Sequence, residues 1–338
     1  MKFEWIDFYS EFATKLLLFK NDRKALIERI NDVYTAINMQ VPKLESGGDI
    51  IDIDPFTIFG LFNKGITNSN RIAIIRSIAN VFGIESKVPN NFDGIPVLNN
   101  LKATFYAFKE DRKADDIDNI WNVFEAALRL ADNDTEQNRK EFSKWYDLVH
   151  DQRCIRWNIT MGLYWIRPYT YINLDSRNRW YISNVENMPA EFVDSIKKKI
   201  NKVPNATDYL FIKDACIKAL EVGSYKYKNY PELSYSAWIV SEQVNRQKAA
   251  ANGKKLSNAA FLRWFKPLIQ ALRDLGGSGT PAEARAKIVE NEQLSDEEVN
   301  ATRGKNNVNK FENEVAFARS YLVNAGYIDK SIYGVWTL

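Results

Sequence analysis

The chain has 338 residues, of which 45% are hydrophobic and 13% aromatic, and its formal net charge is +3. This composition indicates globular folding and excludes a disordered chain, and the length suggests two or three domains. No apolar run approaches the ~20 residues of a membrane span, and the acidic N-terminus lacks the apolar stretch of a signal peptide, so we expect a soluble, cytoplasmic protein with no membrane partner.

The sequence offers few groups for catalysis. Cys154 and Cys216 stand in no C-x-x-C frame, and His150 is the single histidine. This leaves no zinc or disulfide pattern, and it leaves Ser-His-Asp or Cys-His catalysis with one candidate base and no supporting motif. No Walker-type phosphate loop or dinucleotide-binding motif occurs either. We therefore predict a protein that is not an enzyme and that carries no cofactor and no metal.

Apolar residues recur every three or four positions between Trp5 and Ile166, which predicts a multi-helix domain. Two helices are expected within residues 3–38, and two more between residues 136 and 166. A short helix is expected at Pro55, capped by Asp54, and another after a cap at Asn68 or Ser69. Two further helices are expected between residues 91 and 131, separated by a charged connector.

That connector contains Glu110, Asp111, Arg112 and Lys113, which are similar to the acid-x-Lys tail of metal-dependent nucleases. The alternative is a solvated loop. We favour the loop because no neighbouring strand pattern supplies the further carboxylate that a magnesium site requires.

The run from Arg167 to Ile182 changes character, since Pro168, alternating aromatic residues and a polar turn predict extended structure. Aromatic and polar side chains of this kind can form a pocket for a flipped or modified base. The alternative is a packed domain edge, because Trp and Tyr are common at core margins. The candidate pocket residues are Trp165, Tyr169, Tyr171, Arg177, Arg179 and Trp180.

From Met188 the chain becomes rich in lysine and is interrupted by prolines, and residues 196–258 carry 12 basic and five acidic groups. Helices are expected over 190–200, 207–221 and 234–250, followed by the polar linker QKAAANGKKLSN. We expect three parts: a helical domain over residues 1–187, a basic helical connector over 188–255 and a third domain over 256–338.

The third domain shows the order of elements of a winged helix-turn-helix: a helix over 260–275, the turn GGSGT, a helix from Pro281, and a third helix that ends at Gly326. Residues 327–336 suit two short strands around a turn at 329–331, which form the wing. The predicted fold is therefore mainly α, with a small β-hairpin wing. The apolar stripe of the third helix is Phe311, Val315, Ala318, Leu322 and Ala325, widened by Phe317 and Tyr321.

Basic and amide side chains gather before this third helix. Arg and Lys bind phosphate or guanine, and Asn can pair with adenine, so the side chains suit double-stranded DNA. The alternative is a solvated loop, and the domain is neutral overall, with 10 basic and 10 acidic groups over residues 259–338. The candidate DNA-binding residues are Arg303, Lys305, Asn306, Asn307, Asn309, Lys310 and Asn313 at the recognition helix, and Lys330 and Tyr333 on the wing.

The C-terminal part of the chain, from about Ala260 to Leu338, resembles the N-terminal winged-helix domain of Mrr-type restriction proteins. The resemblance rests on LIQALRDLGG, LSDEE, FENEVAFARSYLVNAG and GVW, which begin at Leu268, Leu294, Phe311 and Gly334. In that family this domain binds DNA and a separate domain cuts it. The resemblance therefore implies DNA binding without catalysis.

The N-terminal part of the chain, as far as Ile182, resembles the N-terminal regions of McrB-like proteins of modification-dependent restriction systems. The resemblance rests on DIDPFTIFGLFNKGI, FDGIPVLNN, DDIDNIWNVFEAAL and NITMGLYWIRPYTYINLDSRNRWYI, which begin at Asp52, Phe92, Asp115 and Asn158. Such proteins continue into an AAA+ GTPase motor, and this chain does not. The resemblance thus implies a fragment of a longer parent chain, or a subunit that works with a motor and a nuclease in trans.

These expectations lead to one principal hypothesis, a non-catalytic DNA-recognition component of a restriction or anti-phage system that reads duplex DNA, with modified bases as candidate targets. One alternative is a protein-interaction adaptor that docks a motor or nuclease and forms a homodimer through its winged helix. A second is a winged-helix transcriptional regulator, which normally binds symmetric half-sites as a dimer.

Overall fold

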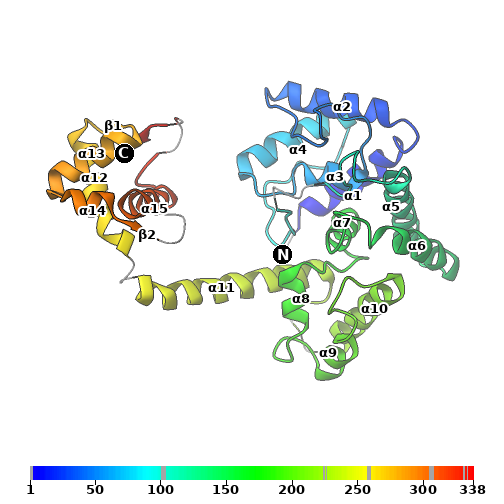
Figure 1. Cartoon of the computed structure of the whole chain (residues 1–338). Coiled ribbons are helices and arrows are strands. Elements are labelled where there is room, and N and C mark those ends of the chain that lie inside the picture. The colour runs from blue at the N-terminus through cyan, green and yellow to red at the C-terminus, as the bar shows by residue number, and fades with distance from the viewer. Residues whose placement is uncertain are drawn as a thin grey trace. The chain divides into compact units, whose positions relative to one another are not determined.

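The structure is a computed structural model that describes residues 3–99, 104–223, 225, 227–256, 260–303, 308–329, 332 and 334–338. The chain forms two compact units, unit 1 over residues 1–243 and unit 2 over residues 244–338 (Figure 1). The predicted fold class is confirmed, because helices dominate both units and the β-strands of the described residues are short antiparallel pairs in unit 2. No helix in the described part of the chain is long and apolar enough to cross a membrane.

Unit 1 is built from helices joined by loops, and α11 continues from it into unit 2. In Figure 1, α2 lies beside α4, and α5 beside α6. The helices are α1 (Trp5–Leu17), α2 (Arg23–Ala36), α3 (Pro55–Gly60), α4 (Asn68–Phe82), α5 (Asp116–Asp132), α6 (Glu136–Val149), α7 (Asn158–Ile166), α8 (Ser176–Ile182), α9 (Ala190–Ile196), α10 (Ala206–Val222) and α11 (Tyr230–Leu256).

Side-chain caps fix the start of several of these helices. Asp54 accepts hydrogen bonds from the amides of Phe56 and Thr57, and Pro55 takes the first position of α3, as the sequence predicts. Thr67, and not Asn68 or Ser69, caps α4 by accepting from the amide of Asn70.

Helix α7 runs through the centre of the unit 1 core, and all its residues from Ile159 to Ile166 are buried. Gly162 lets α7 pack directly on α3, since a Cβ at this position would lie 2.6 Å from the Phe56 ring. The same core also contains Met188, Phe192 and Leu220. The chain therefore does not change cores at residue 188, where we expected the first domain boundary, and the three-part division stays a prediction.

The structure corrects three expected segments. Residues 176–182 form α8 and not an extended strand, because Asp175 caps a helix there. The described residues between 91 and 115 form loops and turns. Of the two helices expected between residues 91 and 131, the described residues therefore contain one, α5. The expected linker is helical to Leu256, because α11 continues through its alanine- and lysine-rich residues.

Unit 2 contains the remaining elements of the chain. Strand β1 pairs antiparallel with β4, with Ser278 opposite Thr337, and β2 pairs with β3, with Thr302 opposite Asn309. The elements are a 3-10 helix (Ala260–Trp264), α12 (Phe265–Asp274), β1 (Ser278–Gly279), α13 (Pro281–Glu292), α14 (Asp296–Asn300), β2 (Thr302–Arg303), β3 (Val308–Asn309), α15 (Lys310–Asn324) and β4 (Trp336–Thr337).

The core of unit 2 follows most of the predicted stripe of α15. Phe311, Val315, Ala318 and Leu322 are buried against Trp264, Leu268, Leu272 and Ile288. Phe317 and Tyr321 were expected to widen this stripe, but they are 50% and 44% exposed. Ala325 is also exposed, since it caps the C-terminal end of α15. The hairpin expected over residues 327–336 differs in the structure, because β4 pairs with β1 and Asp329, expected in the turn, bridges to β4 instead, with its amide donating to the carbonyl of Thr337 at 2.7 Å.

Candidate functional site

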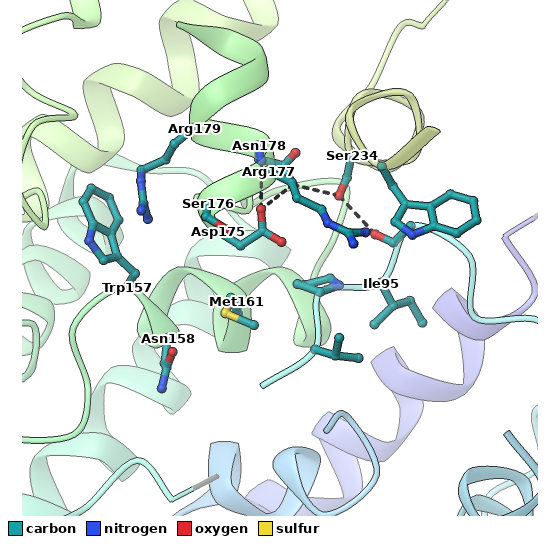
Figure 2. A pocket seen from close by; sticks show the side chains of 14 residues that line it. Ile95, Trp157, Asn158, Met161, Asp175, Ser176, Arg177, Asn178, Arg179 and Ser234 are labelled. Atoms are coloured by element: carbon teal, nitrogen blue, oxygen red, sulfur yellow. Dashed lines mark hydrogen bonds between the residues drawn. The ribbon is translucent and has the colours of Figure 1, made fainter. Parts of the chain in front are cut away.

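Two neighbouring pockets lie in unit 1, and Trp157 and Asn158 line both. The first pocket has a volume of about 400 Å³ and opens between α7, α8, α11 and the loop 94–97. Figure 2 shows Trp157 and Arg179 at one end of this pocket and Ser234 at the other. Its lining residues are Gly94, Ile95, Pro96, Val97, Trp157, Asn158, Met161, Asp175, Ser176, Arg177, Asn178, Arg179, Ser234 and Trp238.

A buried polar network ties three of these walls together. The Oδ1 atom of Asp175 accepts from the backbone amide of Asn178 at 2.8 Å and from its Nδ2 atom at 3.0 Å. Asn178 Nδ2 also donates to Ser234 Oγ at 3.3 Å, and Ser234 Oγ donates to the carbonyl of Gly94 at 3.1 Å (Figure 2). The network fixes α8 against α11 and against the loop 94–97.

The loop 94–97 is held in place from two sides. Gly94 has a φ of +78°, and a Cβ added to it would lie 3.0 Å from Tyr235 Cα, so this position of the wall requires glycine. On the other side, the indole N–H of Trp165 donates to the carbonyl of Pro96 at 3.0 Å. Trp165 is fully buried, so it supports the pocket from behind and does not enter it.

Two arginines of α8 bring positive charge to the first pocket. The guanidinium carbon of Arg179 lies 3.8 Å from the centre of the Trp157 ring, and its Nη1 atom donates to the carbonyl of Leu174 at 2.7 Å. Burial lowers the pKa of Arg179 from its ordinary value, which lies far above neutral pH, so the side chain stays charged. Arg177 forms a salt bridge with Glu242 of α11 at 2.6 Å.

The second pocket has a volume of about 460 Å³ and lies between the turn 104–111 and the loop that leads into α7. The turn is fixed by the buried carboxylate of Glu45, which accepts from Arg112 Nη1 at 2.6 Å and from the amide of Lys109 at 2.9 Å. The lining residues are Thr104, Tyr106, Ala107, Phe108, Asp111, Arg153, Cys154, Ile155, Arg156, Trp157 and Asn158.

The loop that leads into α7 is strained. Cys154 has a φ of +77° and Arg156 a φ of +47°, and neither residue is glycine. Left-handed backbone at such residues costs roughly 1 kcal/mol or more each and gathers at functional sites. This backbone conformation places Cys154 and Arg156 on the rim of the second pocket. Trp157 follows them in the chain and lines both pockets.

The structure gives the predicted pocket residues different places. Arg177 and Arg179 line the first pocket, whereas Trp165 and Tyr171 are buried in the core, where the Tyr171 hydroxyl donates to the carbonyl of Ala127. Tyr169 is 58% exposed and Trp180 42% exposed, and neither lines one of the two pockets. The prediction assumed extended backbone, in which every second side chain shares a face. Residues 176–182 form the helix α8 instead, so this alternation does not hold there.

The aromatic residues that line the first pocket are Trp157 and Trp238. Both lie outside residues 165–180, which contain all the predicted pocket residues. Trp157 lies just before α7, close in sequence to the aromatic residues of that segment, whereas Trp238 lies in the lysine-rich region expected to be a connector. The aromatic signal alone could point to Trp157. It could not point to Trp238, because its approach depends on how α11 packs.

Only part of the predicted DNA-binding set lies in the described residues of unit 2. Asn309 caps α15 by accepting from the amide of Glu312 at 2.9 Å, and its Nδ2 atom donates to the carbonyl of Val299 at 2.8 Å. The side chain of Asn309 therefore positions the helix. Lys310 is exposed at the first position of α15. Lys305, Asn306, Asn307, Lys330, Tyr333 and the side chain of Arg303 lie outside the described residues.

The solvent face of α15 carries a shallow hollow of about 200 Å³. It is lined by Asn313, Ala316, Phe317 and Ser320, of which only Asn313 was among the sequence candidates. Phe317 was predicted to widen the buried stripe, because it lies next to that stripe in a helical projection. Its exposure becomes clear only when Phe311, Glu314, Val315 and Ala318 are seen to fill the buried face.

The charged connector forms ion pairs and hydrogen bonds to neighbouring loops. Asp111 pairs with Arg153 at 2.6 Å, Arg112 pairs with Glu45, and Glu110 accepts hydrogen bonds from the hydroxyl of Ser46. Within the described residues, no group of three or more His, Cys, Asp or Glu side chains is placed to hold a metal ion. The pairings agree with the loop that we favoured over a nuclease motif.

Comparison with protein families identifies both units. The model of the family described as Domain of unknown function (DUF8425) matches residues 5–240. The chain belongs to this family. The Mrr N-terminal domain matches residues 261–338. No curated protein and no solved structure matches the chain.

The DUF8425 match covers nearly all of unit 1 and contains both pockets. The Mrr match falls inside unit 2 and confirms the resemblance found in its sequence. The resemblance of the N-terminal part of the chain to McrB-like proteins has no such support and stays a prediction. Neither of the two matched families is described as catalytic.

Proposed function

We propose that this DUF8425 protein is a non-catalytic DNA-recognition component of a restriction or anti-phage system. Unit 2 binds double-stranded DNA, with α15 as its recognition helix and the segment before β4 as its wing. The observation that carries the proposal is the Mrr N-terminal match, which falls inside a unit that contains, in winged-helix order, α12, β1, α13, α15 and β4, with α14, β2 and β3 inserted between α13 and α15.

The solvent face of α15 supports this role. Lys310 and Asn313 lie near its N-terminus, where helix-turn-helix proteins contact base edges and phosphates. Ala316, Phe317 and Ser320 continue the face, and apolar side chains can contact thymine methyl groups. In the proposal, Lys305 in the chain between β2 and β3 completes the set.

The experiment that tests this function is binding of a labelled duplex to the full chain, followed by fluorescence anisotropy at several salt concentrations. If four or five basic groups meet phosphates, the logarithm of the binding constant falls against the logarithm of salt with a slope of about −4. The double variant Lys305→Ala/Lys310→Ala should bind more weakly and show a shallower slope. Binding that is independent of salt, or unchanged in the double variant, would contradict the proposal.

Lys266→Ala is the matched control, because Lys266 is an exposed lysine of the same unit but belongs to α12. It should leave both affinity and slope unchanged. A loss equal to that of the double variant would indicate a general charge effect instead of a specific face.

The first pocket of unit 1 is the proposed reader of modified bases. It offers the indole ring of Trp238, the polar edge of Asp175 and the positive charge of Arg177 and Arg179, groups that can stack on and hydrogen-bond an extruded base. A competition panel of unmodified, cytosine-modified and N6-methyladenine duplexes tests this role. Equal competition by all three duplexes would contradict this role of the first pocket. It would not affect the proposal that unit 2 binds duplex DNA.

In this proposal the chemistry belongs to partners, an AAA+ GTPase motor and a nuclease, in trans or in a longer parent chain. A second candidate function, a protein-interaction adaptor, is favoured by one feature: Phe317 and Tyr321 are exposed and pack against Phe261, with centroid separations of 6.1 and 5.0 Å. Exposed aromatic patches often mark protein contacts, including homodimers. Capture of a purified motor or nuclease together with failed duplex binding would favour the adaptor.

A further inference from the structure

The second pocket of unit 1 combines an aromatic wall with a basic rim. Trp157, Tyr106 and Phe108 supply rings, and Arg153 and Arg156 stand where the pocket meets solvent. Its volume of about 460 Å³ lies in the range of small-ligand pockets, and its wall at Tyr106 is fixed by Arg112, which packs over the ring at 5.2 Å.

Trp157 is one of the residues that line both pockets. Arg179 lies over the ring at 3.8 Å, and Arg179 lines the first pocket but not the second. The Trp157 side chain is half-buried, so part of it remains accessible to a ligand. A planar nucleobase that stacks on the ring face opposite Arg179 would hold the indole between itself and the guanidinium.

The charge on the rim favours an anion. Within the described residues, no carboxylate lies within salt-bridge distance of Arg156. Arg153 pairs with Asp111 at 2.6 Å, but the two side chains are 66% and 52% exposed, so this pair is weak and can exchange for a phosphate. The left-handed backbone at Arg156 holds that residue on the rim beside Trp157.

We propose that the second pocket binds one nucleotide unit, with its base stacked on Trp157 and its 5′-phosphate against Arg156 and Arg153. Two sources share this chemistry, a free mononucleotide and a nucleotide of a single DNA strand. The inference concerns unit 1 alone, so it does not require unit 2 to bind duplex DNA or the first pocket to read modified bases.

The test is calorimetric titration of the full chain with deoxyadenosine 5′-monophosphate, deoxyadenosine, inorganic phosphate and the single-stranded trinucleotide of deoxyadenosine. The monophosphate should bind at least tenfold more tightly than deoxyadenosine or phosphate alone. Tighter binding of the trinucleotide identifies a DNA strand as the source, and equal or weaker binding identifies the free nucleotide.

Arg156→Asn should weaken binding of the monophosphate about tenfold, and Asn is chosen because it tolerates the φ of +47° at this exposed position. Arg76→Ala is the matched control, since Arg76 is an exposed arginine of α4 in the same unit and lines neither pocket, and it should leave the affinity unchanged. An unchanged thermal unfolding curve shows that each variant is folded. No binding of the monophosphate or the trinucleotide at millimolar concentration, or equal losses in the two variants, would overturn the proposal.

Discussion

The guanidinium of Arg179 stacks on the indole of Trp157 at 3.8 Å, and Trp157 lines both pockets of unit 1. Replacing Arg179 with Ala removes the cation–π contact and the hydrogen bond to the carbonyl of Leu174. We expect the free energy of unfolding to fall by about 1–2 kcal/mol, and Arg179→Lys to recover part of it. Urea unfolding of both variants checks this, and equal loss in Lys and Ala would exclude a role for the charge.

The cap of α8 gives a second prediction. Asp175→Ala should cost about 1 kcal/mol of unfolding free energy and should loosen both α8 and the loop 94–97, because Asn178 then keeps only its hydrogen bond to Ser234. Hydrogen exchange measured by mass spectrometry should show faster exchange in both segments.

Thr135→Ala is the control for this substitution, since Thr135 caps α6 through the amide of Asn138 and lies outside both pockets. It should cost a similar amount and speed exchange only near the start of α6. Faster exchange of the loop 94–97 in both variants would mean that the loop reports on general stability.

Asp54 predicts a dependence of stability on pH. Burial raises the pKa of this carboxyl from 3.8 to about 6 in the folded chain, against the opposing hydrogen bonds from Thr57 and Phe56. The folded chain therefore binds more protons than the unfolded chain between these values, and the free energy of unfolding falls as pH rises from about 4 to about 6. The contribution of Asp54 to this fall is on the order of 3 kcal/mol.

Asp54→Asn isolates this contribution, because Asn keeps a carbonyl oxygen for the amides that Asp54 caps but does not titrate. Relative to the variant, the original chain should lose stability between pH 4 and pH 7 in urea unfolding. The carboxyls of Glu11 and Asp134, whose pKa values are lowered, act in the opposite direction but cancel in the comparison. A constant difference across this pH range would show that Asp54 is ionised throughout.

Glu314 is a buried acid in the core of unit 2. Its Oε2 atom accepts from the indole N–H of Trp264 at 2.9 Å and lies 3.8 Å from Arg263, while its Oε1 atom has no hydrogen-bond partner among the described residues. Glu314→Gln keeps the acceptor and removes the buried charge, so stability should be unchanged or higher. Glu314→Ala leaves the Trp264 N–H unpaired and should cost about 1–3 kcal/mol. Thermal unfolding distinguishes the two, and a large loss in Gln would indicate that the charge is needed.

Phe317 separates binding from stability on α15. Its side chain is 50% exposed, so Phe317→Ser should change the free energy of unfolding by no more than about 0.5 kcal/mol. If α15 reads DNA, the same variant should weaken duplex binding in the anisotropy assay. A strong loss of stability would place Phe317 in the core, as its sequence position first indicated.

Helical periodicity predicted most of the fold, because its signals lie in neighbouring residues. These signals are the apolar stripes of α1, α2 and α4, the helix cap at Asp54 and the helix end at Gly326. The errors arose where tertiary packing decides. Arg167–Ile182 reads as extended from its alternating aromatics, yet Asp175 starts a helix, and this turns Arg177 and Arg179 toward the pocket while Trp180 faces solvent.

The candidate site was harder to predict from the sequence than the fold. Its walls come from four segments, and contacts such as Ser234 with Gly94 join residues 140 positions apart. No local pattern encodes such a contact. The strained backbone of Cys154 and Arg156 was equally hidden, because neither residue type signals a left-handed conformation.

The contact between Gly94 and Tyr235 has a consequence for how sequences of this family can vary. A methyl group at residue 94 would meet the backbone of α11 at 3.0 Å, whereas Val97 of the same loop is 47% exposed. Relatives that retain the first pocket should therefore keep glycine at the position of Gly94 and diverge freely at that of Val97. A substituted glycine would mark a lineage in which this cavity has been remodelled or lost.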